Sequence, residues 1–244
     1  MYSELLSWLM TPLSGSGIHI ISSSVSWHGR LMVMAWGFML PVSLVIARYY
    51  KVMPNQDWPN ELDRKFWWHA HRSIAYVACG FTMIGVFLIF KQSDYSGNFR
   101  ILHAYLGWTL VFLAAIQIAG AHLRGTKGGP TAPRLAVDGT FLDLHGDHYD
   151  MTPRRIIFER IHKTIGTIAV CFAAIEIVIG MYLADAPRWM WVGLALWWFS
   201  AICWVIFLQI NGRCINTYQA IWGTDPTLPG ARVKPIGWGI RSIG

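Results

Sequence analysis

Five apolar segments, each about as long as a membrane is thick, constrain this chain more than any other feature of its sequence. A bilayer core of about 30 Å is crossed by roughly 20 apolar residues in a helix. The segments are Leu31–Ala47, Ser73–Phe90, Ile101–Ala121, Ile165–Leu183 and Met190–Ile210. With 54% hydrophobic and only 14% charged residues, the chain has too little charge to cover a soluble domain of 244 residues. None of the segments alternates like a barrel strand, so we predict an all-α integral membrane bundle of five transmembrane helices.

Lysine and arginine are distributed unequally between the two sides of these segments. Four of the 20 such residues lie on the same side of the membrane as the N-terminus, namely Arg30, Lys91, Arg100 and Arg188. The other 16 lie on the opposite side. The positive-inside rule therefore predicts a periplasmic N-terminus and a cytoplasmic C-terminus in a bacterial inner membrane. The net charge of +7 then reflects topology and attraction to membrane lipid. Because no nucleic-acid motif accompanies it, we expect no nucleic-acid partner.

The segments outside the spans divide the chain into three regions. Residues 1–26 form an N-terminal interfacial segment, in which we expect a short helix, Leu5–Met10, anchored by Trp8. Residues 27–210 form the transmembrane domain. Residues 211–244 contain Gly, Pro and isolated aromatic residues but no span, so we expect an extended cytoplasmic tail that lies on a partner.

Histidines stand at the start of four of the five spans. His28 precedes the first span, His69 and His71 the second, His103 the third and His162 the fourth. Helix direction places His28 and His103 near the outer face, and the histidines of the second and fourth spans near the inner face. Ionisable residues at a membrane usually have a function. Two histidine pairs, one near each face, are the arrangement required for two bis-histidine haems in a four-helix core.

Glycines one helical turn after two of these histidines support this interpretation. Gly107 follows His103 and Gly166 follows His162 at the spacing that puts both residues on one helix face, where a flat macrocycle could approach the backbone. The alternative is that each histidine is an interfacial residue hydrogen-bonded to headgroups or water. Zinc or copper fits less well, because the helices offer no further Cys or carboxylate partners at either face.

A polar connection, DLHGDHYD (143–150), contains two further histidines, His145 and His148. Histidines and carboxylates so close together could hold a metal ion. A solvated surface loop is the favoured interpretation, because the segment lies in a long polar connection on the cytoplasmic side.

Four stretches of the chain resemble the cytochrome b561 family. They are WHGRLMVMAWGFMLPVSLVIARYYK (27–51), WWHAHRSIAYVACGFTMIG (67–85), HAYLGWTLVFLAAIQIAGAHLR (103–124) and FERIHKTIG (158–166). The resemblance covers residues 27–240 and is to the five-helix form that follows a DOMON domain in some plant and fungal proteins. It implies two non-covalent haem b groups and one-electron transfer. No DOMON domain precedes the helices in this sequence, so we expect any outer redox partner to be a separate molecule.

The family pairs its first histidine with its third and its second with its fourth. Carried over, this implies that His28 and His103 ligate an outer haem iron, and that His71 and His162 ligate an inner one. The pairing agrees with the sorting of the histidines by membrane face.

The resemblance also chooses between the two histidines of the second span. The family has an aromatic residue four positions before the ligand and a glycine fourteen positions after it. Counted from His71, these positions hold Trp67 and Gly85. Counted from His69, the first position does not hold an aromatic residue and the second does not hold a glycine. The resemblance therefore implies that His71 is the ligand and His69 an interfacial neighbour.

Basic residues close to the ligands are candidates to hold the haem propionates. Arg72 and Lys163 directly follow His71 and His162, and Arg124 also lies on the inner side. Arg30 is the corresponding candidate on the outer side.

The predicted function is a dihaem electron carrier that passes single electrons between partners on the two faces. We expect it to be a subunit of, or a partner to, a larger respiratory or photosynthetic redox complex, with quinone as a further candidate partner. One alternative is a stand-alone oxidoreductase for quinone, superoxide, ferric iron or ascorbate. A second is a non-redox membrane scaffold with interfacial histidines. The sequence leaves open whether the chain is an enzyme.

Overall fold

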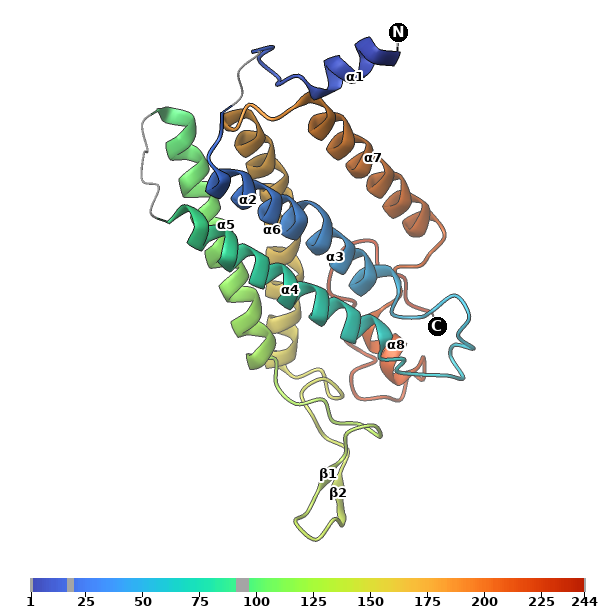
Figure 1. Cartoon of the computed structure of the whole chain (residues 1–244). Helices are drawn as coiled ribbons and strands as arrows, with labels where there is room; N and C mark the ends of the chain where they lie inside the picture. Colours follow the sequence, from blue (N-terminus) through green and yellow to red (C-terminus); the bar gives the residue numbers. More distant parts are fainter. Residues whose placement is uncertain (1, 17–19, 91–96, 244) are drawn as a thin grey trace. The chain divides into compact units, whose positions relative to one another are not determined.

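The computed structural model describes residues 2–16, 20–90 and 97–243, and five helices within them are long and apolar enough to cross a membrane (Figure 1). They are Ser23–Tyr49, α4 (Phe66–Ile89), α5 (Asn98–Leu123), α6 (Pro153–Leu183) and α7 (Arg188–Ile210). The predicted all-α integral membrane fold is confirmed. Lys91, one of the outer charges, lies outside the described residues.

The chain folds into two compact units, and every long helix contributes residues to both. Unit 1 comprises Met1–Ser43, Arg72–Phe112 and Ala169–Phe207. Unit 2 comprises Leu44–His71, Leu113–Ile168 and Leu208–Gly244. His28 and His103 therefore belong to unit 1, and His71 and His162 belong to unit 2.

A π-helical turn interrupts the first span in unit 1. The span runs from α2 (Ser23–Met32) through η1 (Val33–Met39) to α3 (Leu40–Tyr49). A π-turn shifts the backbone hydrogen-bond pattern, and the carbonyl of Gly37 accepts a bond from Trp197 Nε1 at 2.9 Å. Buried Trp36 donates to Thr82 Oγ1 at 3.0 Å. Polar atoms at membrane depth thus find partners within the protein, as lipid requires.

The N-terminal segment of unit 1 contains α1 (Tyr2–Met10), which covers the predicted interfacial helix. None of its side chains is buried. Ser14 Oγ donates to Asp185 Oδ2 at 2.6 Å, and the backbone N–H of Arg188 donates to the carbonyl of Thr11 at 3.1 Å. These bonds fix the segment to the connection between α6 and α7, so that α1 lies beside the start of α7 (Figure 1).

Helix α6 begins well before its apolar segment, so His162 lies inside a continuous helix and not at its first turn. Pro153 is its first residue, a position where the missing proline N–H costs nothing. Arg155, Glu159 and Lys163 recur at every fourth position, on one face of the helix. Arg155 Nε donates to Glu159 Oε1 at 3.0 Å, and Lys163 Nζ donates to Glu159 Oε2 at 2.6 Å. These ion pairs stabilise the polar extension.

The connection between α5 and α6, in unit 2, carries a short antiparallel hairpin (Figure 1). Its strands are β1 (Arg134–Leu135) and β2 (Phe141–Asp143). An ion pair of 2.7 Å between Arg134 Nη2 and Asp143 Oδ2 joins the two strands.

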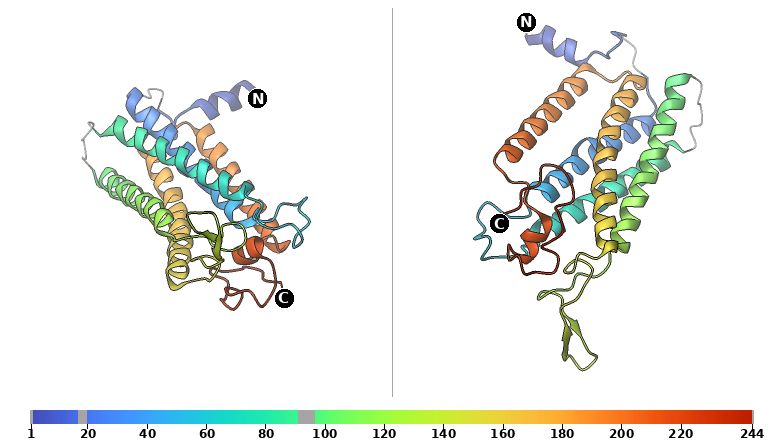
Figure 2. Two further views of the ribbon diagram at one scale, coloured as in Figure 1. Left: turned by 90° about the horizontal axis from the view of Figure 1, so that it is seen from below. Right: turned by 180° about the vertical axis from the view of Figure 1, so that it is seen from behind.

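The C-terminal tail differs from the extended segment that the sequence predicts. It contains a buried helix, α8 (Thr217–Trp222), and winds around it beside the connection that follows α3 (Figure 2). Tyr218 and Trp222 form an apolar cluster with Met151, against which Trp67 packs. Two of the isolated aromatic residues that suggested contact with a partner, Tyr218 and Trp222, are therefore core residues of unit 2, while Trp238 is 67% exposed.

Basic side chains near the ends of the spans that lie on the predicted cytoplasmic side hold this tail through its backbone. Each donates a hydrogen bond to a tail carbonyl: Arg48 to Trp238 at 2.7 Å, Lys51 to Ile215 at 2.9 Å and Lys163 to Ile236 at 3.0 Å. Burial lowers the pKa of Lys51 to about 8. The charges that indicate topology in the sequence thus also organise the fold of the tail.

Replacing Tyr218 by phenylalanine is expected to loosen the tail. The hydroxyl of Tyr218 donates to the carbonyl of Tyr149 at 2.8 Å and accepts from the N–H of Gly230 at 3.0 Å. Its loss leaves two buried backbone groups without this partner, at a cost of about 1–3 kcal/mol. Amide hydrogen exchange of residues 217–233 should show that the free energy of opening this segment is lower by that amount. Y105F, at a side chain that is 73% exposed, is the matched control and should leave exchange unchanged.

Candidate functional site

Two of the predicted ligands face each other in unit 1. His28 of α2 and His103 of α5 have ring centroids 6.2 Å apart, and their ring planes are inclined by 81°. Both side chains are half-buried. Residues 75 positions apart in the sequence are therefore brought together as a pair.

The same geometry recurs in unit 2. The rings of His71 in α4 and His162 in α6 have centroids 6.2 Å apart, with an interplanar angle of 83°. His69 is exposed, and its ring instead lies against Trp68, with centroids 4.9 Å apart. The structure therefore places His71, and not His69, opposite His162.

The spacing of both pairs suits one metal ion between the two rings. With metal–nitrogen bonds of about 2 Å, two imidazoles on opposite sides of one ion have centroids roughly 6 Å apart. In the part of the chain that the structure describes, no cluster of three or more His, Cys, Asp or Glu side chains could hold a metal. A pair without further protein ligands fits haem iron, because the macrocycle supplies the four equatorial nitrogens.

Three of the four histidines have a defined environment at Nδ1. His28 Nδ1 lies 3.0 Å from the carbonyl of Gly85, and His103 Nδ1 lies 2.8 Å from Oε1 of Glu176. An Nδ1 that donates to such an acceptor leaves Nε2 free to ligate a metal. Nδ1 of His162 and Nδ1 of His103 are buried and have no hydrogen-bond partner of good geometry among the described residues, so the approach of Glu176 to His103 is an ion-pair contact.

The glycines near the histidines make room for these side chains. A Cβ on Gly180 would lie 3.0 Å from Cε1 of His103, and one on Gly107 would lie 3.2 Å from Oε1 of Glu176. Gly85, which fits the family spacing from His71, packs against the other pair. A Cβ there would lie 2.8 Å from Met32 and 3.7 Å from Nδ1 of His28. The approach of a macrocycle at Gly107 and Gly166 stays a prediction.

The predicted propionate partners have varied contacts. Lys163 donates to Glu159 and to the tail carbonyl of Ile236, while Arg72 is exposed. The guanidinium of Arg124 lies 5.3 Å from the centroid of the Trp68 ring, and that of Arg30 lies 5.1 Å from the ring of Trp27. None of these contacts tests the predicted role.

The sequence reasoning missed Glu176, although a signal for it was present. Glu176 is the one acidic residue in the apolar segment Ile165–Leu183, and only 8% of it is exposed. An isolated carboxylate in a span is costly and therefore marks a site.

The loop histidine His148 is not the solvated surface residue that the sequence favours. It is 4% exposed, and its ring lies 5.8 Å from that of Trp222 and 6.2 Å from that of Tyr218. Its Nε2 lies 3.7 Å from Oε1 of Glu159. His145 of the same loop is exposed and binds Asp150 at 3.0 Å. The loop thus contributes one histidine to the core of unit 2 and leaves the other at its surface.

The stability of this core is expected to fall in acid because of His148. Burial, followed by the charge of Arg155, lowers the pKa of His148 to about 3, although Glu159 opposes this; Lys127 and Arg124 add further positive charge. Below about pH 6.5 the side chain of His148 binds a proton in the opened loop but not in the folded loop. The free energy of opening therefore falls by up to about 1.4 kcal/mol per pH unit.

Hydrogen exchange of residues 214–236 between pH 7 and pH 4 measures this effect. H148Q should remove much of the pH dependence, while the matched variant H145Q should keep it. An identical acid response in wild type and H148Q would assign the effect to other groups.

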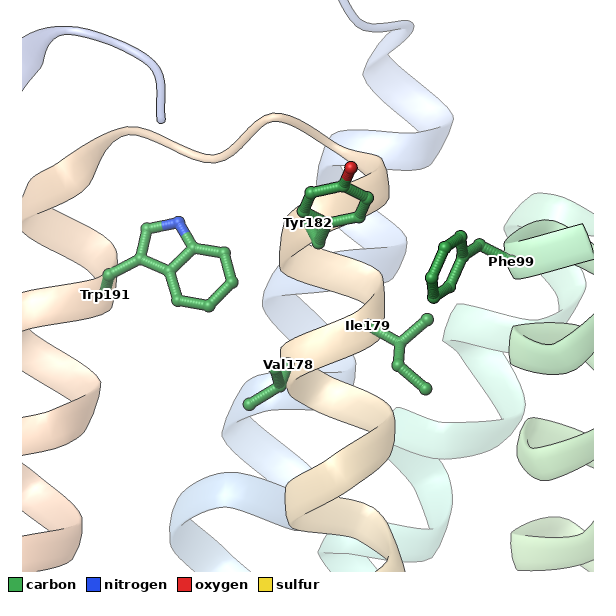
Figure 3. A pocket seen from close by; sticks show the side chains of 5 residues that line it. All are labelled: Phe99, Val178, Ile179, Tyr182 and Trp191. Carbon is green, nitrogen blue, oxygen red and sulfur yellow. The ribbon is translucent and has the colours of Figure 1, made fainter. Parts of the chain in front are cut away.

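A separate hollow in unit 1 has an apolar lining (Figure 3). It encloses about 220 Å³ between α5, α6 and α7, and its lining residues are Phe99, Val178, Ile179, Tyr182 and Trp191. No charged side chain lines it. Its surface suits a hydrocarbon chain and offers no ligand for a metal.

Comparison with known proteins gives consistent matches. Residues 22–124 match the eukaryotic cytochrome b561 family. A cytochrome b561, DM13 and DOMON domain-containing protein of Arabidopsis thaliana is 26% identical over 194 residues, which cover 76% of this chain and 18% of that protein. Ferric-chelate reductase 1 of Bos taurus is 28% identical over 157 residues, covering 64% of this chain and 22% of that protein. A cytochrome b561 and DOMON domain-containing protein of Arabidopsis thaliana is 24% identical over 206 residues, which cover 79% of this chain and 42% of that protein. No solved structure matches significantly.

Five apolar helices define a multi-pass membrane protein, and the relatives that it matches are named as cytochrome b561 domain proteins or ferric-chelate reductases. Residues 22–124 are therefore similar to the cytochrome b561 family, and two of these relatives are named for a cytochrome b561 domain. The matched residues include His28, His71 and His103, while His162 lies beyond them. The chain spans less than half the length of these relatives.

Proposed function

We propose that the chain carries two haem b groups and passes single electrons between partners on the two faces of a membrane. His28 and His103 would ligate one iron, and His71 and His162 the other. The observation that carries this proposal is the repeated geometry: two separate histidine pairs, each with ring centroids 6.2 Å apart and nearly perpendicular planes.

The chain's own residues would bind, orient and insulate the cofactor. Haem b supplies reversible one-electron chemistry at its iron. The carbonyl of Gly85 and the carboxylate of Glu176 hold the Nδ1 sides of His28 and His103, so that Nε2 can face the metal. The surrounding apolar helices exclude water. Basic residues near the ligands, Arg72 and Lys163 among them, would bind propionates.

The distribution of basic residues supports a definite orientation. We propose that the N-terminus is periplasmic, that His28 and His103 lie near that face, and that the C-terminal tail is cytoplasmic. Location in a bacterial inner membrane rests on the sequence prediction, and the relatives described above come from a plant and a mammal.

Redox proteins on each face are the proposed partners, within or beside a larger respiratory or photosynthetic complex, and quinone is a further candidate. A second function is favoured by one comparison. Several relatives are named ferric-chelate reductase 1, so reduction of a ferric chelate by the chain itself is the alternative proposal.

Removing single histidines tests the proposed ligands. H71A should lose about half of the haem bound by the purified wild-type chain, because it would empty one of two equal sites. H69A, the matched control two residues away, should keep its full haem content. Haem per protein and the reduced-minus-oxidised absorption spectrum measure both variants.

The opposite pattern, with haem lost from H69A and kept by H71A, would exclude the proposed pairing. A wild-type chain without a reducible haem band would exclude the electron-transfer function and favour a membrane scaffold. Turnover of a ferric chelate by the pre-reduced chain, without any partner protein, would favour the alternative function over a carrier that needs a docked acceptor.

A further inference from the structure

A buried carboxylate contacts one of the proposed ligands in unit 1. Oε1 of Glu176 in α6 lies 2.8 Å from Nδ1 of His103 in α5. Glu176 is 8% exposed, and among the described residues neither its second oxygen, Oε2, nor Nδ1 of His103 has a hydrogen bond of good geometry, so the 2.8 Å approach is an ion-pair contact. An ionised or strongly polar group at this position costs free energy unless a partner stabilises it. Of the contacts that the structure gives for Glu176, the one with His103 can offset that cost.

The two helices are shaped around this contact. Glu176 and Gly180 stand one turn apart on α6, so they share a helix face. A Cβ at position 180 would come within 3.0 Å of the His103 ring, and a Cβ at Gly107 would come within 3.2 Å of the carboxylate. Glycine on each helix therefore permits the close approach of carboxylate and imidazole.

Glu176 also distinguishes His103 from the other ligands whose Nδ1 environment is defined. His28 faces a neutral backbone carbonyl, and His162 faces no acceptor among the described residues. A carboxylate is a stronger acceptor than a carbonyl, and a hydrogen bond to it makes the imidazole a stronger electron donor at Nε2. Stronger donation stabilises ferric over ferrous iron and lowers the reduction potential of a haem.

We propose that Glu176 is a positioning residue for the haem of unit 1, which fixes the ring of His103 and lowers the reduction potential of that haem. This inference rests on the proposed function, because it requires a haem between His28 and His103. Glu176 does not touch the metal; it acts through its 2.8 Å contact with Nδ1 of His103. The two haems would then differ in potential because their ligands differ in the groups that face Nδ1.

The isosteric variant E176Q isolates the charge of the carboxylate. Gln keeps the size of the side chain and an oxygen that can accept from His103, so haem should stay bound. At a fixed solution potential the ratio of reduced to oxidised unit 1 haem should rise about tenfold, which for a one-electron couple corresponds to 59 mV. A redox titration followed by absorbance measures the shift, and the low-spin ferric EPR signal of the same haem should change with it.

Two further variants assign the effect. In the H71A background the remaining haem is the one between His28 and His103, so its reduction potential can be measured without overlap from the other haem. E176Q should shift that potential in this background as well. E61Q removes one carboxylate from a partly exposed ion pair with Arg64 and is the matched control for net charge. It should leave both potentials unchanged.

The possible results separate the two proposals. E176Q with two bound haems but unchanged potentials and an unchanged EPR signal would overturn the role of Glu176 and leave the ligands standing. A shift of equal size in E61Q would also overturn it, because net charge alone would then explain the result. Absence of haem from the wild-type chain would overturn the proposed function itself.

Discussion

The need to satisfy polar atoms inside an apolar bundle governs the structure of this protein. Water cannot serve as a partner at membrane depth, so each buried donor and acceptor needs a partner within the protein. The indole of Trp36 binds Thr82, and the indole of Trp197 binds the carbonyl of Gly37 in the π-turn. The same requirement acts on the histidine side chains, because each imidazole has two nitrogens to satisfy. In His28 one nitrogen lies 3.0 Å from a backbone carbonyl, and in His103 one nitrogen lies 2.8 Å from a carboxylate oxygen.

Charge serves two purposes in unit 2. Basic residues at the cytoplasmic ends of spans are usually explained by topology alone. In this protein Arg48, Lys51 and Lys163 also donate hydrogen bonds to backbone carbonyls of the tail. Buried Glu159 neutralises part of this charge through Arg155 and Lys163. The tail consequently packs as part of the protein, and its Tyr218 and Trp222 lie in the core of unit 2.

Sequence reasoning succeeded where a single helix carries the signal. Five apolar segments predicted five spanning helices, because length and composition alone decide whether a helix suits a bilayer. It failed where the partner of a residue lies on another helix. Glu176 lies 73 positions from His103, and no periodicity relates them. The burial of His148 depends on α8, and the pattern of the loop resembles an ordinary polar connection. Resemblance to the family, through the spacing of Trp67 and Gly85, selected His71 over His69 before the structure placed His71 opposite His162.

The sequence by itself therefore determined the class of the protein: an all-α integral membrane protein with five spans and histidines near the starts of four apolar segments. Tertiary structure decided which imidazoles face each other, which Nδ1 atoms have an acceptor, and that the tail folds. The physical reason is the range of the interactions. Transfer of an apolar helix into a membrane is a local property of consecutive residues. A polar contact such as that between Glu176 and His103 needs an approach within about 3 Å, which only the packing of separate helices can provide.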